Sequence, residues 1–118
     1  MKPMIYADNH KKTRDGFAKI LESHYKVRVD KVDDGMGLVE MVRKEDYSIV
    51  ITDHNMGFMS GLEAISEIKE FNPQVPIIIV SAQNIEQKAL EIGASAYLKK
   101  PIVDWDQLFE AIDRLSKA

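Results

Sequence analysis

The sequence YSIVITDHNMGFMSG, from Tyr47 to Gly61, decides the fold class. Its first part, YSIVIT, is apolar and largely β-branched, and a second run of this kind, VPIIIVS, extends from Val75 to Ser81. Continuous runs of this type are typical of strands that are covered on both faces, as in a parallel sheet. The apolar run ends abruptly at Asp53, so a carboxylate stands where a buried strand is expected to end.

Three shorter apolar runs complete a set of five predicted strands. They are MIYA (Met4–Ala7), KVRVDKV (Lys26–Val32) and SAYLK (Ser95–Lys99). Segments with helical spacing separate the five runs, and strict alternation with right-handed crossovers predicts a parallel sheet with helices on both faces. We therefore expect an α/β fold, a doubly wound, flavodoxin-like three-layer sandwich with five parallel strands in the order 2-1-3-4-5.

Capping signals mark the starts of the later helices. Three sequences place a capping side chain three residues before Glu or Gln, which predicts a capping box: SGLE (Ser60–Glu63), NIEQ (Asn84–Gln87) and DWDQ (Asp104–Gln107). Gly93 suits the position just after a short fourth helix. Helices are also expected at about His10–His24 and at about Gly35–Glu45, where Gly37 weakens the second.

Composition limits the classes of function. The 118 residues, 45% of them hydrophobic, fit a single domain over residues 1–118 with one core. The 16 basic and 19 acidic residues give a net charge of −3, so no nucleic-acid partner is expected. Cysteine is absent, which excludes disulfides and thiolate metal sites. The apolar start MKPMIYAD is too short for a signal peptide or membrane span, so we expect a cytoplasmic protein without a membrane partner.

Polar residues follow four of the predicted strands. Asp8 and Asn9 follow the first strand, Asp53 the third, Ser81 the fourth and Lys100 the fifth. In open parallel sheets the ligand crevice lies beyond the carboxyl ends of the strands, where the strand order reverses. Strand ends are often polar because loops meet water, so one such residue alone indicates little. Two carboxylates, a hydroxyl and an amine converging from four strands predict a functional site.

Two other groups of polar residues are interpreted as ordinary surface. The opposite ends of the strands show nothing comparable and are expected to carry solvated residues: Lys2, Lys26, Tyr47 and Gln74. Three histidines lack the spacing of metal ligands and are interpreted as solvated side chains, the last of them bordering the site: His10, His24 and His54.

The chain resembles the receiver domains of bacterial two-component response regulators, including single-domain regulators of the chemotaxis type. The resemblance spans essentially the whole chain and rests on four segments in a fixed order: IYADNH, DHNMGFMSG, IIIVSA and GASAYLKKP. It implies a phosphorelay signal receiver that is not an enzyme in its own right but assists its own phosphotransfer. A histidine kinase or a phosphotransfer protein would supply the phosphoryl group, with Mg²⁺ as cofactor.

The resemblance implies a role for each polar strand end. Asp53 would accept the phosphoryl group, and Asp8 would be a carboxylate of the Mg²⁺ pocket that Asp53 shares. Asn55 would add its backbone carbonyl as a metal ligand. The hydroxyl of Ser81 would hold a phosphoryl oxygen, and Lys100 would pair with the phosphate.

The resemblance also implies a switch. Tyr97 matches the aromatic residue that changes rotamer when a receiver switches, together with a movement of the Ser81 loop. The surface formed by the fourth helix, the fifth strand and the last helix would then change its affinity for a downstream protein. The expected oligomeric state is a monomer or a weak, phosphorylation-dependent dimer.

Several residues depart from the family pattern. Asn9 stands where the family has a second acidic metal ligand. Its amide oxygen can still coordinate Mg²⁺, but one negative charge is lost, which predicts weaker Mg²⁺ binding and slower phosphorylation. Gly57 replaces the usual Pro and Ser60 the usual Asp, so a more flexible loop is expected after Asp53. The segment from Ser81 to Lys100 is about one helical turn short, which predicts a short or displaced fourth helix.

Two alternatives remain beside the phosphorylatable receiver. In the first, Asn9 reports a degraded pocket, and the domain is a pseudo-receiver that binds its partner without phosphorylation. In the second, the chain is another α/β enzyme or a flavin binder. The second is disfavoured because the first strand ends in Asp8 rather than in a Gly-rich phosphate loop, and because no second acid stands two residues after Asp53.

Overall fold

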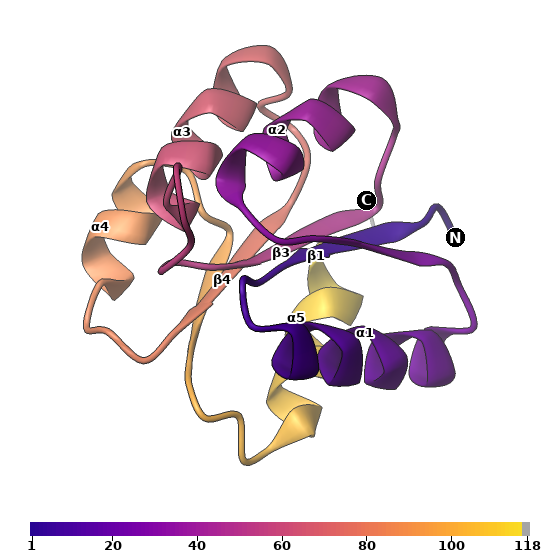
Figure 1. Ribbon diagram of the computed structural model, residues 1–118. Helices are drawn as coiled ribbons and strands as arrows, with labels where there is room; N and C mark the ends of the chain where they lie inside the picture. Colours follow the sequence, from indigo (N-terminus) through magenta and orange to yellow (C-terminus); the bar gives the residue numbers. More distant parts are fainter. Residues whose placement is uncertain (117–118) are drawn as a thin grey trace.

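The computed structural model describes residues 1–116, which form a five-stranded sheet between two layers of helices (Figure 1). All neighbouring strands are parallel, in the order β2-β1-β3-β4-β5. The strands are β1 (Met4–Ala7), β2 (Val29–Val32), β3 (Ile49–Asp53), β4 (Ile77–Ser81) and β5 (Ala96–Lys99). The expected fold class and strand order are confirmed. The last two residues of the expected domain, 117 and 118, lie outside the described part of the chain.

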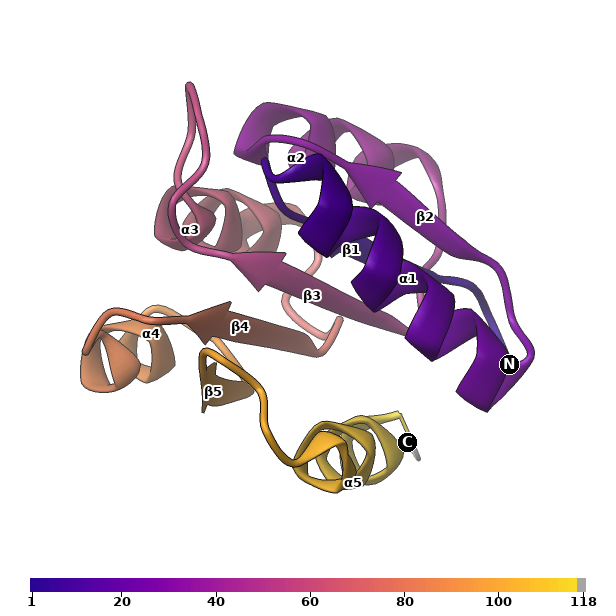
Figure 2. The same cartoon turned by 60° about the horizontal axis from the view of Figure 1, so that its bottom comes forward.

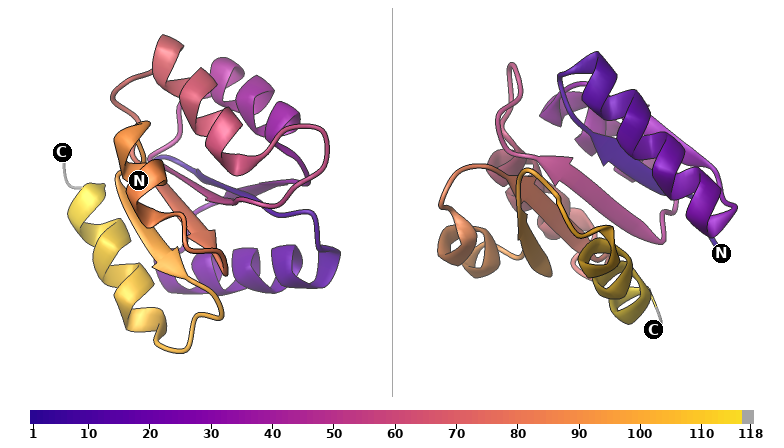
Figure 3. Two further views of the ribbon diagram at one scale, coloured as in Figure 1. Left: turned by 90° about the vertical axis from the view of Figure 1, so that its left-hand side faces the viewer. Right: turned by 90° about the horizontal axis from the view of Figure 1, so that it is seen from below.

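The helices divide into two layers, one on each face of the sheet. One layer consists of α1 (Lys11–Tyr25) and α5 (Trp105–Leu115). The other consists of α2 (Gly35–Lys44), α3 (Gly61–Phe71) and α4 (Glu86–Glu91). Figures 1 and 3 show the two layers on opposite sides of the strands. No helix among residues 1–116 is long and apolar enough to cross a bilayer.

The core explains why the central strands are apolar up to their polar carboxyl ends. In β3, Val50 packs into the core cluster under α2, α3 and α4, whereas Ile49 and Ile51 pack into the cluster under α1 and α5. In β4, Ile79 and Ile78 divide between the two clusters in the same way. Because successive side chains of a strand point to opposite faces, both faces of each central strand must be apolar.

Two of the three predicted capping residues cap their helices, and the full capping box is confirmed at the first of them. Ser60 and Glu63 form the expected capping box at the start of α3. Asp104 caps α5 by accepting a hydrogen bond from the backbone N–H of Asp106. The expected box at Asn84 is wrong: the N-cap of α4 is Ile85, which has no side-chain cap. A tight turn places the Ile85 N–H on a carbonyl two residues earlier, so the helix begins one residue later than predicted.

The start of β2 and the extent of α4 can be compared with the predicted ranges. β2 begins at Val29, not at Lys26, because Lys26 ends α1 in the left-handed conformation with a φ of 58°. The fourth helix is short, as expected, with 6 residues. Gly93 follows it with a φ of 120°, a conformation that glycine adopts without strain.

The loop between β3 and α3 turns back onto the end of β3. Figure 2 shows it projecting beyond the helices, with Phe58 92% exposed. The loop closes where the Gly61 N–H donates a hydrogen bond to the His54 carbonyl. A Cβ atom on Gly61 would lie 2.2 Å from the carbonyl oxygen of Asp53. The loop therefore needs glycine at position 61 to place Asp53.

Candidate functional site

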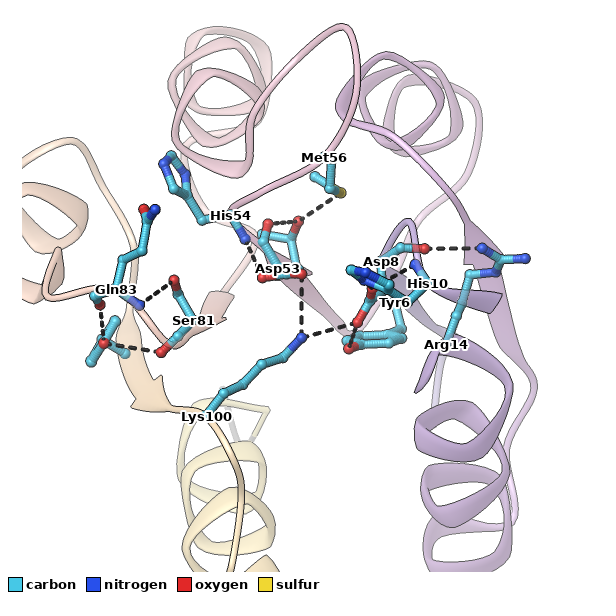
Figure 4. A network of polar contacts seen from close by, with 12 residues as sticks. Tyr6, Asp8, His10, Arg14, Asp53, His54, Met56, Ser81, Gln83 and Lys100 are labelled. Atoms are coloured by element: carbon cyan, nitrogen blue, oxygen red, sulfur yellow. Dashed lines mark hydrogen bonds and ion pairs between the residues drawn. The ribbon is translucent and has the colours of Figure 1, made fainter. Parts of the chain in front are cut away.

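The carboxyl ends of four strands bring the predicted polar residues to one edge of the sheet (Figure 4). Asp8 follows β1, Asp53 is the last residue of β3, Ser81 is the last residue of β4 and Lys100 follows β5. The residue exposures of Asp8, Asp53 and Ser81 are 0%, 6% and 1%. Burying a polar side chain costs free energy unless it has hydrogen-bond or charged partners. The partners of these three side chains therefore show how the site is built.

Lys100 lies between the two carboxylates. Its Nζ is 3.1 Å from Oδ2 of Asp8 and 3.3 Å from Oδ2 of Asp53. The Lys100 side chain is 23% exposed, whereas the Asp8 side chain is fully buried. One ammonium therefore faces two carboxylates, and the three groups together keep one negative charge. Such a cluster attracts a further cation.

Asp8 is held from three sides. Its Oδ2 accepts a hydrogen bond of 2.7 Å from the Tyr6 hydroxyl, and its Oδ1 accepts one of 2.9 Å from the His10 N–H. Arg14 donates to the Asp8 carbonyl. Burial alone raises the pKa of Asp8, but the hydrogen bonds from His10, Tyr6 and Lys100 outweigh it and hold the pKa below its usual value. Asp8 is therefore a carboxylate at neutral pH.

Asp53 presents one oxygen to the backbone and the other to Lys100. Its Oδ1 accepts a hydrogen bond of 2.7 Å from the His54 N–H. Its carbonyl accepts one of 2.8 Å from the Thr52 hydroxyl, which fixes the end of the strand. The carboxylate is thereby oriented with Oδ2 toward Lys100 in the crevice.

Ser81 and Tyr97 are linked through one loop. The Ser81 hydroxyl oxygen accepts a hydrogen bond of 3.0 Å from the Gln83 N–H, which leaves its proton free to be donated. The Tyr97 hydroxyl lies within hydrogen-bond distance of the carbonyls of Ser81 and Gln83. Burial, and then the charge of Glu86, raise the pKa of Tyr97, so its hydroxyl remains protonated. Residues 81–83 and Tyr97 therefore form one connected unit.

The two asparagines lie at the rim of the site. Asn9 and Asn55 are both exposed, in the loops that follow β1 and β3. Their proposed roles as metal ligands stay predictions.

His10 is a residue of the site that the sequence interpretation missed. Its side chain is exposed, as expected, but its Nδ1 lies only 3.5 Å from Oδ1 of Asp8. Asp8, His10 and Asp53 each offer one ligand atom, and these atoms lie within 4.8 Å of one another. The available signal was its position two residues after Asp8, where a backbone N–H commonly bonds to an Asp side chain.

His54 has one unusual atom. Its Nδ1 is buried and has no hydrogen-bond partner among the described residues. The backbone N–H of the same residue binds Asp53. His54 therefore borders the site, as expected, and its contact with Asp53 comes from the backbone.

At the opposite edge of the sheet the expectation of solvated residues is confirmed for Lys2, Lys26 and Gln74, which are exposed, and is wrong for Tyr47. Arg28 donates to Asp30 and to Glu45, and the Tyr47 hydroxyl donates to Oδ2 of Asp30 at 2.6 Å. Tyr47 is only 3% exposed because its ring packs into the core under α2 and α3. A polar cluster therefore exists at the amino ends of the strands as well.

The donor set at the carboxyl ends fits a divalent cation. Asp8 and Asp53 supply two carboxylates with a nearby imidazole, and the net negative charge of the cluster suits a cation. Oδ2 of Asp8 binds Tyr6 and Lys100, whereas Oδ1 accepts the His10 N–H and lies 3.5 Å from the His10 ring nitrogen.

Comparison with known proteins agrees with the fold and with this cluster. The family model for the response regulator receiver domain matches residues 4–113. The chain therefore belongs to the response regulator receiver domain family and is a receiver domain of two-component signalling. The resemblance stated from the sequence is confirmed.

Two curated relatives and one solved structure illustrate the likeness. The chain is 33% identical over 103 residues to the chemotaxis protein CheY of Halobacterium salinarum, covering 85% of each protein. It is 38% identical over 84 residues to the transcriptional regulatory protein ZraR of Klebsiella oxytoca, covering 69% of this chain but only 19% of ZraR. The response regulator TrrA from Thermotoga maritima, solved in complex with Mg²⁺-BeF, superimposes with a TM-score of 0.89 at 24% identity, covering 98% of this chain and 99% of TrrA.

Proposed function

We propose that this chain accepts a phosphoryl group on Asp53 from a histidine kinase or a phosphotransfer protein, and that the modification changes a protein-binding surface. The supporting observation is the setting of Asp53, whose Oδ1 is fixed by a backbone N–H while Oδ2 faces Lys100 in a polar crevice. The names of two relatives, a chemotaxis protein and a transcriptional regulator, agree with a signalling role.

Phosphoryl transfer needs a nucleophile and nearby positive charge that neutralises the transferred group. An oxygen of the Asp53 carboxylate attacks the phosphorus, the P–N bond to the donor histidine breaks, and its electron pair stays on the imidazole nitrogen. Lys100 already lies 3.3 Å from Asp53 and balances the charge of the arriving group. The Ser81 hydroxyl, whose oxygen accepts from the Gln83 N–H, donates a hydrogen bond to a phosphoryl oxygen.

Asp8 and Asp53 would hold the divalent cation, together with the carbonyl of Asn55. The cation supplies neutralisation of the phosphoryl oxygens when it is bound. The fully buried carboxylate of Asp8, kept ionised by its hydrogen bonds, provides a charged ligand at neutral pH. TrrA, the similar structure, was solved with Mg²⁺-BeF, which supports a Mg²⁺ site in this crevice.

The switch begins at the loop after β4. A phosphoryl group adds about two negative charges beside Lys100 and the Ser81 hydroxyl, creating new charge-assisted hydrogen bonds. Because Tyr97 binds the carbonyls of residues 81 and 83, a movement of this loop is transmitted to the Tyr97 ring. The ring adjoins a groove lined by residues of the α4–β5–α5 surface, among them Glu86, Leu98 and Arg114. This surface would bind the downstream protein, and the chain would act as a monomer or a weak phosphorylation-dependent dimer.

Intact-mass spectrometry tests the proposal. The chain is treated with acetyl phosphate and MgCl₂, alongside the variants Asp53→Ala and Asp30→Ala. Wild type and Asp30→Ala should gain the mass of one phosphoryl group, and Asp53→Ala should not. An unmodified wild type that binds its downstream partner fully would instead favour the pseudo-receiver. A mass gain that survives in Asp53→Ala would sink the assignment of Asp53.

A further inference from the structure

We infer that the imidazole ring of His10 is a metal ligand of this site and makes it favour Mn²⁺ over Mg²⁺. The inference rests on the proposed function, because it concerns the divalent cation of the same crevice. The ligand atoms of Asp8, His10 and Asp53 lie within 4.8 Å of one another. Ligands of a six-coordinate ion at about 2.1 Å are separated by about 3 Å when adjacent and about 4.2 Å when opposite. The three donors therefore need only a small contraction.

The backbone places the His10 ring on the open side of Asp8. The His10 N–H is bonded to Oδ1 of Asp8 at 2.9 Å, and the ring Nδ1 lies 3.5 Å from the same oxygen. Oδ2 already binds Tyr6 and Lys100, so the ring lies beside the oxygen that remains for a metal. The His10 side chain is 74% exposed, so the ring can turn toward an ion without losing core packing.

Asn9 removes one negative charge from the ligand set of the family pattern. In the family pattern this position is a second acidic residue, whereas here it is an exposed neutral amide. The crevice therefore offers the carboxylates of Asp8 and Asp53, and Lys100 already balances one of them. Among the His, Cys, Asp and Glu side chains of residues 1–116, His10 is the one grouped with these two carboxylates, so its imidazole can take the place of the missing acid.

The mixed donor set determines the preferred ion. Mg²⁺ favours oxygen ligands and retains its water, whereas imidazole is a good ligand for first-row transition metals. Mn²⁺ shares with Mg²⁺ the octahedral geometry and the preference for carboxylate, carbonyl and water ligands. As a first-row transition metal it also binds an imidazole nitrogen more strongly than Mg²⁺ does. The His10 ring therefore adds affinity for Mn²⁺ that it does not add for Mg²⁺.

Calorimetric titration of the full chain with MnCl₂ and with MgCl₂, without phosphodonor, measures this preference. Oxygen-only sites also bind Mn²⁺ somewhat more tightly, so the informative quantity is the part of the preference that depends on His10. His10→Asn should weaken Mn²⁺ binding about tenfold, the size of effect that follows loss of a group supporting a metal site. Mg²⁺ binding should hardly change. The matched control His54→Asn should alter neither affinity.

Pulsed electron paramagnetic resonance of the bound Mn²⁺ detects the ligand directly. A coordinated imidazole nitrogen modulates the echo, and this modulation should be present in the wild type and in His54→Asn but absent in His10→Asn. An echo without nitrogen modulation in the wild type overturns the inference, and so does an equal weakening of both ions by His10→Asn. Failure to bind Mn²⁺ overturns it as well.

The two proposals fail separately. Phosphoryl incorporation on Asp53 in MgCl₂ without a nitrogen signal from bound Mn²⁺ overturns the role of His10 and supports the receiver function. A nitrogen signal from His10 without any phosphoryl incorporation supports the metal ligand and overturns the receiver function.

Discussion

The two edges of the sheet carry clusters of the same chemical composition. At the carboxyl ends, Lys100 bridges two carboxylates, and the Tyr6 hydroxyl binds one of them. At the amino ends, Arg28 bridges Asp30 and Glu45, and the Tyr47 hydroxyl binds Asp30. Each cluster thus contains one cation, two carboxylates and one tyrosine hydroxyl.

The clusters differ in burial and in the geometry of the bridging cation. The Arg28 side chain is 55% exposed, and its guanidinium contacts both oxygens of Asp30. A guanidinium is a planar fork that satisfies carboxylate oxygens in pairs, whereas an ammonium is a point charge. At the other edge, Lys100 contacts one oxygen of each carboxylate, and Asp8 is fully buried. Composition alone therefore does not mark a functional site; buried carboxylates that share a single ammonium do.

The largest effect is expected at Gly61, whose backbone lies close to the Asp53 carbonyl at the carboxyl edge. Gly61→Ala would put a Cβ 2.2 Å from the Asp53 carbonyl oxygen, and the overlap should lower the free energy of unfolding by about 3 kcal/mol. Urea unfolding followed by Trp105 fluorescence measures it. The matched change Gly57→Ala meets no atom within 4 Å and should not destabilise the chain. Equal stability of the two variants would contradict the need for glycine at position 61.

The second prediction compares the loss of Lys100 with the loss of Arg28, the two side chains that each bridge two carboxylates. Lys100→Met leaves two carboxylates without their shared cation, and should lower the free energy of unfolding by about 2 kcal/mol, less than for a completely buried pair because Lys100 is 23% exposed. Arg28→Met should cost less, because its carboxylates reach water. Urea unfolding of both variants at low and high salt measures the difference. A larger loss in Arg28→Met would reverse the comparison.

A smaller effect is expected from pH at the amino edge. Burial raises the pKa of Asp30, but hydrogen bonds from Tyr47 and Arg28 outweigh it and keep the pKa below its usual value. A carboxyl group with a lowered pKa stabilises the fold above its unfolded value, about 4, and loses this contribution as the pH falls through the folded value. Asp30→Asn should therefore lower the free energy of unfolding by about 1 kcal/mol near neutral pH. The difference from wild type should shrink in acid; a difference that grows in acid would show that the sign is wrong.

The smallest effect concerns the loop that projects after β3. The φ of Gly57 lies outside the left-handed region, so alanine fits its backbone and restricts the unfolded chain. Gly57→Ala should raise the free energy of unfolding by about 0.5 kcal/mol. In urea unfolding, the midpoint should rise while the dependence of the free energy on urea concentration stays unchanged. A clear loss of stability would show that the loop needs glycine at position 57.

The carboxyl edge was predictable from the sequence because parallel strands end at one edge. Each polar strand end could be read directly after an apolar run, so Asp8, Asp53, Ser81 and Lys100 were all placed correctly. His10 was missed because its proximity to the site depends on the backbone turn at Asp8. The signal in the sequence was its position two residues after Asp8, not a spacing of metal ligands.

The amino edge was not predictable for a related reason. Arg28 and Asp30 lie at the start of β2, Glu45 ends α2 and Tyr47 precedes β3. These residues come together only because the fold brings the start of β2, the end of α2 and the start of β3 to one edge of the sheet. In the sequence, nothing distinguishes Tyr47, whose ring is buried and whose hydroxyl is hydrogen-bonded, from a tyrosine on the surface. The start of α4 was misplaced because a local turn competed with the Asn84 cap.

Chemical trapping of the phosphorylated residue tests most directly whether the buried carboxyl edge is the acceptor site. Borohydride reduction converts an aspartyl phosphate to homoserine, and tandem mass spectrometry of the digested chain locates it. After treatment with acetyl phosphate and MgCl₂, homoserine should appear at position 53 and not at position 8 or 30. Homoserine at position 30, or at any site other than 53, would contradict the assignment of Asp53 as the phosphoryl acceptor.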